Sequence, residues 1–332
     1  MRNVKITSTG KYLPKRVVPA SEVDKLIGVK EGTVAAKSGV LERRYADNIN
    51  ETQSKMAAMA IKECLSKVNL DLTDIDALIC TSGTSEQEIP SNAALILKEL
   101  KAKSIGMTAF DINSTCMSFL SGLDTVSYMI DAGRFNRVLF VSSEVASVGI
   151  NYRHLESASL FGDGAVAVLV EKSDGESGII GAQMKIYPEG ADHCRIVGGG
   201  TKYPPQPGTY TEDDCLKFKF EMNGKAVFKL ASQVMRADVD ELLQKCDISL
   251  EHFKLIIPHQ ASKSGMKLIQ KKLGASPDQW MDIIENHGNM VSVSIPLALS
   301  YAIEDQRVHK GDLVLLLATS AGFATGIMII KI

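Results

Sequence analysis

The sequence predicts an α/β protein made of two similar halves. Apolar runs of strand length alternate with longer stretches of helical periodicity, as where "DALICTS" precedes "SNAALILKELKA". This alternation is typical of a sheet covered by helices on both faces. The second half of the chain repeats the order of the first, and a polar link, "KSDGESG", lies between them at residues 172–178. We therefore expect an N-terminal half of residues 1–174 and a C-terminal half of residues 175–332.

The elements of the first half follow from the period of its apolar residues. The alternating "MRNVKITSTGKYLP" predicts an initial strand, and "MTAFDIN" and "RVLFVSSEV" predict two more. Between those two lies "STCMSFLSGLDTVSYMIDAG", whose apolar positions recur at helical spacing. The run "LFGDGAVAVLVEK" predicts the strand that ends this half.

The second half shows the same rhythm. "FKLIIPHQ" predicts a strand before the helical "ASKSGMKLIQKKLG", and "MDIIENHGN" predicts a strand before the helical "MVSVSIPLALSYAIEDQRV". The final "DLVLLLATSAGFATGIMIIKI" predicts two apolar strands, like the pair that ends the first half. Residues 187–215, rich in Gly and Pro, predict a long surface loop of the kind that covers a pocket.

Matching distances along the chain support an internal duplication. About 22 residues separate Cys116 from the strand at Val138, and about 24 separate Met290 from the strand at Val314. A generic βαβ rhythm also produces such spacings, so the pattern allows both explanations. In this register we expect Cys116 and Asn289 to lie at equivalent helix beginnings.

Composition and charge exclude several classes of function. With 37 Lys and Arg against 39 Asp and Glu, the chain has no net field that would gather nucleic acid or an anionic membrane. No window of eighteen apolar residues and no signal-peptide run is present. The six cysteines lack CxxC spacing and the six histidines lack an HExxH pattern. We therefore expect a cytoplasmic protein without a metal site, with free thiols, and with neither nucleic acid nor membrane as a partner.

Cys116, at the centre of "FDINSTCMSFLSGL", is the first candidate for chemistry. Ser114 and Thr115 are good N-cap residues, so Cys116 is expected in the first turn of a helix. There the helix dipole and unpaired N–H groups would lower the pKa of the thiol and stabilise an oxyanion. The alternative is a small apolar filler, because free cysteines are among the most buried residues.

Two polar residues of the second half lie at comparable junctions. His259 follows the proline of "FKLIIPHQ", is expected to correspond to Thr81 or Ser82, and ends a strand where ligands collect in α/β folds. Asn289 lies in "NHGNM", where a glycine suggests a tight turn that presents the Asn, with His287 as support. The alternatives are a structural histidine and a helix cap.

Cys, His and Asn at such junctions resemble the site of the thiolase superfamily of condensing enzymes, most closely the ketoacyl-ACP synthase III group. The resemblance covers nearly the whole chain, and the motifs follow the family's order: "YLPKRVV", "SGVLERRYAD", "AFDINSTC", "LFGDGAVAVLV", "MNGKAVFK", "IIPHQAS", "KKLG" and "HGNMVSVSIPLAL". It implies a thiolase-like fold, in which two βαβαβαββ halves form an αβαβα layered arrangement.

The resemblance also implies a decarboxylating Claisen condensation. Cys116 would take the acyl group from an acyl thioester, and His259 and Asn289 would stabilise the enolate left when a malonyl thioester loses carbon dioxide. The N–H groups of Cys116 and Ala321 would form the oxyanion hole. The product would be a 3-ketoacyl thioester. Acyl-CoA, malonyl-CoA or acyl carrier protein thioesters would be substrates, and no resident cofactor is implied.

A pocket and a docking surface follow from the same resemblance. Phe161 and Phe323 would line the acyl pocket together with Ile89, which precedes Pro90 and would project from the partner subunit of a homodimer. The surface for acyl carrier protein or CoA would contain five lysines: Lys37, Lys229, Lys263, Lys271 and Lys272. A solvated helix face is the alternative for a run such as "KK".

The chain departs from the group's pattern at the CoA face. The places of a Trp and a basic residue hold Thr33 and Lys37, Ser264 stands where an Arg is common, and "SAGF" replaces the turn "GGGF". Glu88 lies one place from the glutamate base of head-to-head acyl-condensing relatives, although a solvated loop also explains Glu86 and Glu88.

These departures leave two alternatives open. One is an acyltransferase or non-decarboxylating condensing enzyme of secondary metabolism on the same fold. The other is a catalytically silent partner subunit, against which the presence of Cys116, His259 and Asn289 argues.

Overall fold

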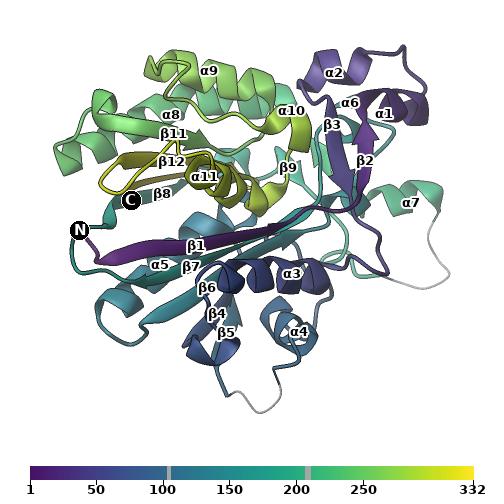
Figure 1. Cartoon of the computed structure of the whole chain (residues 1–332). Helices are drawn as coiled ribbons and strands as arrows, with labels where there is room; N and C mark the ends of the chain where they lie inside the picture. The colour runs from purple at the N-terminus through teal and green to yellow at the C-terminus, as the bar shows by residue number, and fades with distance from the viewer. Residues whose placement is uncertain (103–105, 206–210) are drawn as a thin grey trace.

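Two mixed β-sheets stack with helices outside and between them, giving five layers in the order αβαβα (Figure 1). The structure is a computed structural model that describes residues 1–102, 106–205 and 211–332. The first sheet has the strand order β1-β7-β6-β4-β5. Its strands are β1 (Val4–Tyr12), β4 (Ala77–Cys80), β5 (Thr108–Asp111), β6 (Arg137–Glu144) and β7 (Gly164–Lys172). The predicted thiolase-like α/β fold is thereby confirmed.

The second sheet repeats this arrangement. Its order is β11-β12-β13-β8, and its strands are β8 (Gly178–Ile186), β11 (Phe253–Pro258), β12 (Leu313–Ser320) and β13 (Ala324–Lys331). In both sheets a parallel pair, β4 with β6 and β11 with β12, continues into antiparallel strands. Beside β11, where the first sheet has β5, a single bridge joins Trp280 to Ile256.

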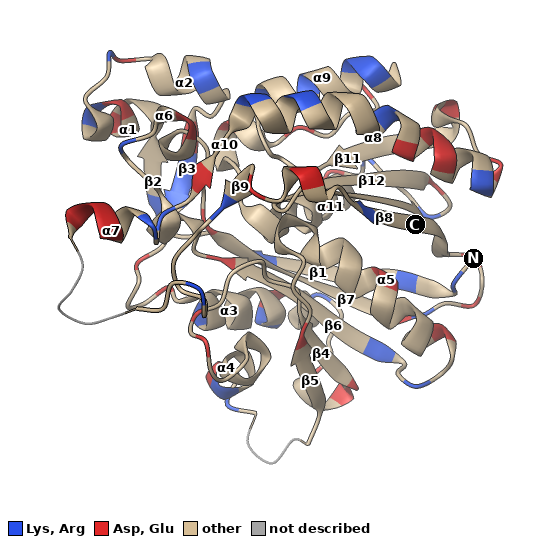
Figure 2. Cartoon of the chain, turned by 180° about the vertical axis from the view of Figure 1, so that it is seen from behind, with Lys and Arg blue, Asp and Glu red and all other residues tan. Residues whose placement is uncertain are grey.

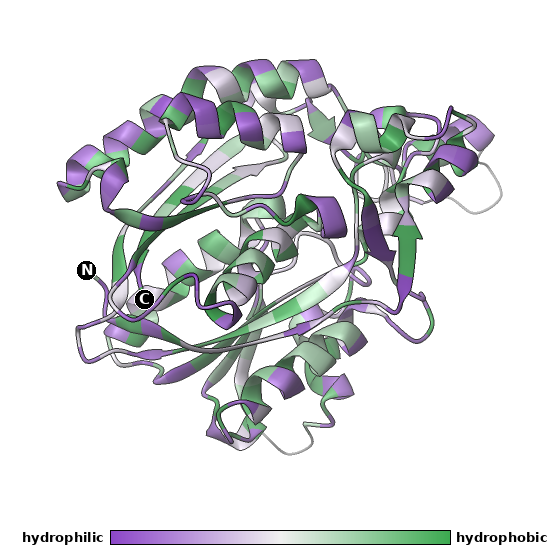
Figure 3. Ribbon diagram, turned by 45° about the horizontal axis from the view of Figure 1, so that its top comes forward, coloured by the Kyte–Doolittle hydropathy of each residue, from purple (hydrophilic) through white to green (hydrophobic). Residues whose placement is uncertain are grey.

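Helices form the remaining three layers. α3 (Gln53–Ser66) and α4 (Asn92–Glu99) cover the outer face of the first sheet, and α8 (Gly224–Cys246) and α9 (Lys263–Leu273) cover that of the second. Between the sheets lie α5 (Ser118–Asp131) and α11 (Ser294–Glu304). Figure 3 shows the apolar colouring of the central helices and the mixed colouring of α8 and α9, as their positions require.

The two halves share one apolar core. Leu120 and Leu123 of α5 belong to the same buried cluster as Leu297 of α11, Val168 of β7 and Leu316 of β12. The polar link expected at residues 172–178 connects β7 to β8, so each sheet is built from one side of it. The division into two units stays a prediction.

Smaller elements complete the chain. The two-stranded sheets pair β2 (Arg16–Pro19) with β3 (Glu42–Tyr45) and β9 (Cys194–Arg195) with β10 (Glu221–Met222). The short helices are α1 (Ala20–Ile27), α2 (Thr33–Ser38), α6 (Leu155–Ala158), α7 (Glu212–Leu216) and α10 (Ile284–His287). The 3-10 turns are η1 (Leu72–Asp74), η2 (Thr115–Met117), η3 (Ala146–Gly149), η4 (Pro188–Gly190), η5 (Leu250–His252) and η6 (Val291–Val293).

The strand expected for "MDIIENHGN" is wrong. The segment forms α10 and a following turn. The Met281 N–H still donates to the Ile256 carbonyl of β11 at 3.0 Å, but further on the Gly288 N–H donates back to the Ile284 carbonyl at 2.9 Å, which closes a helical turn in place of strand pairing. The predicted loop at 187–215 contains η4, β9 and α7, and its residues 206–210 lie outside the described part of the chain. Within the described residues, no helix is long and apolar enough to cross a membrane.

Candidate active site

A cavity of about 1090 Å³ lies between the second sheet, the central layer and the 187–215 loop. The three predicted catalytic residues, Cys116, His259 and Asn289, all line it, and so does Ala321. These residues come from four different junctions along the chain. The fold therefore brings to one cavity the residues that the sequence placed at separate junctions.

Cys116 lies on η2, one 3-10 turn before α5 and not inside the helix as expected. Thr115 before it has a φ of 52°, a conformation that side chains other than Gly adopt at a cost. Two contacts hold this turn against the end of β12. The hydroxyls of Thr115 and Ser320 hydrogen-bond to each other, and the Ser320 hydroxyl donates to the Ser114 carbonyl at 2.8 Å.

Burial raises the pKa of the Cys116 thiol to about 12, and the neighbouring Glu144 and Cys194 add to this. The N–H groups of Ala321 and of Cys116 itself oppose the shift by hydrogen bonding to the sulfur. The expectation of a lowered pKa is therefore wrong for the free protein. Desolvation of the thiolate raises the pKa by more than the N–H groups and the dipole at the helix N-terminus lower it. Cys116 rests as a thiol, and its two N–H partners are the predicted oxyanion-hole donors.

His259 follows directly after β11, and its N–H donates to the Leu317 carbonyl at 2.6 Å. The side chain is buried, and its Nδ1 has no hydrogen-bond partner among the described residues. Burial lowers the pKa of His259 to about 4. The imidazole is therefore neutral at pH 7, so that it can accept a proton or donate one hydrogen bond.

Asn289 is held by hydrogen bonds on both sides. Its backbone N–H donates to the Leu160 carbonyl at 2.8 Å, and its side-chain nitrogen donates to the Ala261 carbonyl at 3.4 Å. The preceding Gly288 has a φ of 67°, and a Cβ there would lie 2.4 Å from the Leu160 oxygen. Only glycine fits this turn, as the tight turn suggested by the sequence requires.

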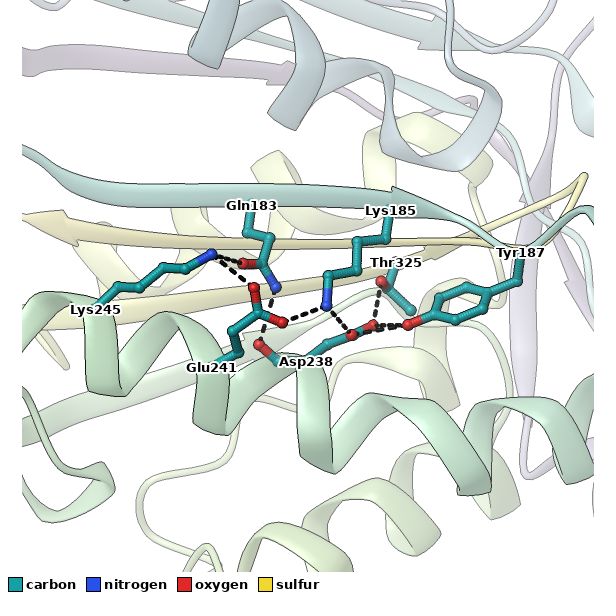
Figure 4. A network of polar contacts seen from close by, with 7 residues as sticks. All are labelled: Gln183, Lys185, Tyr187, Asp238, Glu241, Lys245 and Thr325. Carbon is teal, nitrogen blue, oxygen red and sulfur yellow. Dashed lines mark hydrogen bonds and ion pairs between the residues drawn. The ribbon is translucent and has the colours of Figure 1, made fainter.

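Hydrogen bonds and a contact between two aromatic rings support the turn that contains Ala321. The Tyr187 N–H donates to the Phe323 carbonyl at 2.9 Å, and the two rings meet edge to face. The Tyr187 hydroxyl lies 2.8 Å from both carboxylate oxygens of Asp238, a buried residue of α8 (Figure 4). The same carboxylate accepts hydrogen bonds from Lys185 at 2.8 Å and from the hydroxyl of Thr325 at 2.7 Å. This network ties α8 to the strands that carry the turn.

Phe161 and Phe323, predicted for the acyl pocket, both line the cavity. Ile89 does not line the cavity of its own chain, and its exposed fraction is 84%. Both glutamates nearby are exposed, but only Glu86 lines the cavity, and it accepts a hydrogen bond from the Ser54 N–H at 2.7 Å.

The five predicted surface lysines fall into two groups. Lys37 forms an ion pair with Glu156 at 3.1 Å, and Lys263 pairs with Asp282 at 2.6 Å and with Glu285 at 3.0 Å. Their charges are thereby neutralised, which the sequence did not reveal because these carboxylates are distant in the chain. The other three are exposed and form no ion pair within the described residues: Lys229, Lys271 and Lys272.

Sequence reasoning missed Glu144. This fully buried residue ends β6 and accepts hydrogen bonds from the N–H groups of Gly83 and Thr84 and from the hydroxyls of Thr84 and Ser292. Burial raises the pKa of its carboxyl to about 7. The signal in the sequence for this residue was a carboxylate at the end of the predicted strand "RVLFVSSEV". Among the described residues, no group of His, Cys, Asp and Glu could hold a metal ion.

The five-layered fold and this cavity define the class: the protein is a thiolase-fold condensing enzyme. The family model described as 3-Oxoacyl-[acyl-carrier-protein (ACP)] synthase III matches residues 110–188, and the model of its C-terminal region matches residues 243–332. A beta-ketoacyl-[acyl-carrier-protein] synthase III of Aquifex aeolicus is 32% identical, over 98% of this chain and 99% of the relative. Its counterpart from Solibacter usitatus is 33% identical, over 98% of both chains.

Solved structures agree with these relatives. The 3-oxoacyl-[acyl-carrier-protein] synthase III of Aquifex aeolicus has a TM-score of 0.88 at 31% identity, with 99% of this chain and 100% of that chain covered. The Thermus thermophilus enzyme has a TM-score of 0.87 at 27% identity, with 98% of both chains covered. This chain belongs to the beta-ketoacyl-acyl-carrier-protein synthase III family. It is an acyltransferase, a condensing enzyme of the synthase III type, and the prediction of this family is confirmed.

Proposed function

We propose that Cys116 is the acyl-accepting nucleophile and that His259 and Asn289 support the decarboxylating step. The observation that carries this proposal is that all three line the same cavity, in which the N–H groups of Cys116 and Ala321 face the Cys116 sulfur. The Cys116 sulfur attacks the carbonyl carbon of an acyl thioester, and the bond from that carbon to the donor's sulfur breaks. His259 is the neutral base available to take the proton from Cys116. This proton then leaves with the thiol of the acyl donor.

The second substrate is a malonyl thioester. Loss of carbon dioxide from it leaves an enolate, whose oxygen accepts hydrogen bonds from His259 Nε2 and the Asn289 amide. The enolate carbon attacks the acyl carbonyl carbon on Cys116, while the two N–H groups stabilise the oxyanion that forms. The carbon–sulfur bond to Cys116 then breaks, which releases a 3-ketoacyl thioester and leaves a thiolate to be reprotonated from solvent. No metal or resident cofactor takes part in this scheme.

We also propose a homodimer. β5 is an edge strand that, within the described residues, pairs only with β4, and an open edge readily pairs with a second copy. The exposed Ile89 lies near this edge, because the N–H of Asn92 donates to Asp111 of β5 at 2.8 Å. Pairing of two such edges would direct Ile89 toward the acyl pocket of the partner subunit. Light scattering that gives the mass of one chain would contradict the dimer.

The proposed protein partner is acyl carrier protein, after which the related synthases are named. Lys229, Lys271 and Lys272 are exposed without ion pairs in the described part of the chain and suit an acidic partner. Acyl-CoA is the alternative acyl donor. We assign the activity to fatty acid biosynthesis. We also propose a cytoplasmic location, because all six cysteines are free thiols, which a reducing compartment favours.

Intact mass spectrometry tests the proposal. Incubation with an acyl thioester should add the mass of one acyl group to the wild type and none to Cys116→Ala. Malonyl thioester should then remove that mass and release carbon dioxide. Equal labelling of Cys116→Ala would refute the nucleophile. Labelling that a malonyl thioester cannot discharge would refute the condensation and leave the acyltransferase alternative.

A further inference from the structure

The charges at the opening of the cavity distinguish between two kinds of acyl donor. Three cationic side chains both line the cavity and are exposed to solvent: Lys37, Arg195 and Lys225. Exposed residues of the lining mark the opening through which a thioester must pass to reach Cys116. Whether their charges are free therefore determines what can bind at the opening.

Carboxylates neutralise two of these three cations. Lys37 pairs with Glu156 at 3.1 Å, and Arg195 pairs with Asp192 at 2.6 Å and also with Glu221. Within the described residues, only Lys225 of the three forms no ion pair. A ligand with several phosphate charges would thus meet one free cation in place of three.

Glu156 has a second effect at the same opening. A Cβ on Gly224, the first residue of α8, would lie 2.9 Å from Glu156 Oε2. The beginning of a long helix attracts phosphate through its unpaired N–H groups and its dipole. A side-chain carboxylate already lies against this helix end, so a phosphate there would be repelled.

Outside the opening the surface is basic. Four lysines on α8 and α9 are exposed and form no ion pair among the residues that the structure describes: Lys229, Lys267, Lys271 and Lys272. α8 and α9 pack against each other, and in Figure 2 the basic residues recur along α9. We call these four residues the lysine face. Its charge is complementary to an acidic protein that would dock beside the opening.

We infer that the acyl donor for Cys116, like the malonyl thioester, is presented by an acidic carrier protein and not by coenzyme A. The inference rests on the proposed function. The carrier would lie on the lysine face, and only its uncharged pantetheine arm and acyl chain would enter the cavity. Coenzyme A would instead bring its phosphorylated nucleotide against Glu156. The chemistry is thioester exchange: the sulfur of Cys116 bonds to the acyl carbon, and the pantetheine thiol leaves with the proton of Cys116.

The test compares three donors that carry the same acyl chain: acyl carrier protein, coenzyme A, and pantetheine alone. The rate at which Cys116 gains the acyl mass is measured for each at equal, subsaturating concentration. We expect the carrier protein to react at least about tenfold faster than the pantetheine thioester, and the CoA thioester to show no advantage over it. Acyl-CoA that reacts about tenfold faster than acyl-pantetheine would overturn the inference.

Three variants make the test specific. Glu156→Gln, which frees Lys37, should raise the ratio of the CoA rate to the pantetheine rate. Lys271→Glu should lower the ratio of the carrier-protein rate to the pantetheine rate several-fold, with the loss largest at low salt. Lys62→Glu, an exposed change on α3 over the other sheet, is the matched control and should leave both ratios as in the wild type.

The outcomes separate this inference from the proposed function. If none of the three thioesters labels Cys116, the proposed function fails. If all label it but Lys271→Glu and Lys62→Glu behave alike, the lysine face is not the donor's docking surface and the inference fails alone. An unchanged CoA ratio in Glu156→Gln would refute the role of Glu156.

Discussion

Asn113 and Asn289 make the same pair of hydrogen bonds in the two halves of the molecule. The side-chain oxygen of each accepts the N–H two residues further on, from Thr115 at 2.8 Å and from Val291 at 2.9 Å. Their side-chain nitrogens donate to the carbonyls of Gly83 at 3.1 Å and Ala261 at 3.4 Å.

This equivalence changes the register expected from the sequence. Asn289 corresponds to Asn113, and Cys116 corresponds to Ser292, because both follow a residue of positive φ in a 3-10 turn before a central helix. His259 does correspond to Thr81: the N–H of each donates to the neighbouring strand, at 2.6 and 2.7 Å. The two asparagines therefore have the same structural role but different places relative to Cys116.

The first prediction separates the two asparagines. Asn289→Ala should leave acylation of Cys116 largely intact and slow discharge by malonyl thioester at least about a hundredfold, because the proposed hydrogen-bond donor to the enolate is lost. Asn113→Ala should instead slow acylation by roughly tenfold, because the turn that carries Cys116 loses its support. Single-turnover mass spectrometry measures both steps. Equal loss of acylation in the two variants would contradict this division.

The second prediction concerns the reactivity of Cys116. Because the Glu144 charge helps to raise the pKa of the thiol, Glu144→Gln should shift the pH profile of Cys116 alkylation by iodoacetamide to lower pH. Peptide mapping must resolve the site, since the chain has six free thiols. Glu86→Gln is the matched control on the cavity wall, as it does not contribute to this shift. An unshifted profile in Glu144→Gln would contradict the coupling.

The third prediction concerns stability against pH. Burial raises the pKa of Glu144 from 4.5 to about 7, so between these values the folded protein holds a proton that the unfolded chain has lost. This contribution to stability is complete below about pH 4.5 and disappears as the pH rises through about 7. The free energy of unfolding of wild type should therefore fall across this window relative to Glu144→Gln. Parallel curves from urea titrations would argue against it.

The fourth prediction tests the turn before Asn289. Gly288→Ala should lower the free energy of unfolding by about 3 kcal/mol, since it combines a backbone conformation open essentially only to glycine, with φ of 67° and ψ of −165°, with a clash against the Leu160 carbonyl. Gly274→Ala is the comparison variant: its φ of 73° and ψ of 20° are left-handed helical, and the space around it is open, so only about 1 kcal/mol of conformational strain is expected. Equal losses in chemical denaturation would show that neither the backbone conformation of Gly288 nor its contact with the Leu160 carbonyl adds to the cost.

The fifth prediction addresses the network of Asp238 beside the turn that contains Ala321. Asp238→Ala should destabilise the fold by about 3 kcal/mol, because Lys185, Tyr187 and Thr325 lose a buried acceptor. Glu241→Ala removes another partner of Lys185, but one that is exposed to solvent, and should cost far less. Similar denaturation midpoints for the two variants would contradict the importance of burial at Asp238.

Much of the fold could be predicted from local patterns. Strands such as "RVLFVSSEV" and helices such as "ASKSGMKLIQKKLG" are found where their apolar periods place them. The segment "MDIIENHGN" is assigned wrongly to a strand, because its apolar residues fit a short strand and a single helical turn equally well. Its structure depends on which residues the neighbouring β11 and α9 bury.

The sequence by itself determined that Cys116, His259 and Asn289 stand at junctions where polar groups can face a site, because short-range periodicity and turn residues set where elements end. Only the tertiary structure decided the charge states and the partners. Burial keeps the Cys116 thiol protonated, although the beginning of a helix favours the thiolate. Glu156 neutralises Lys37, a residue far from it in sequence, at the cavity opening. Desolvation and long-range pairing depend on which surfaces meet, and a linear pattern does not contain that information.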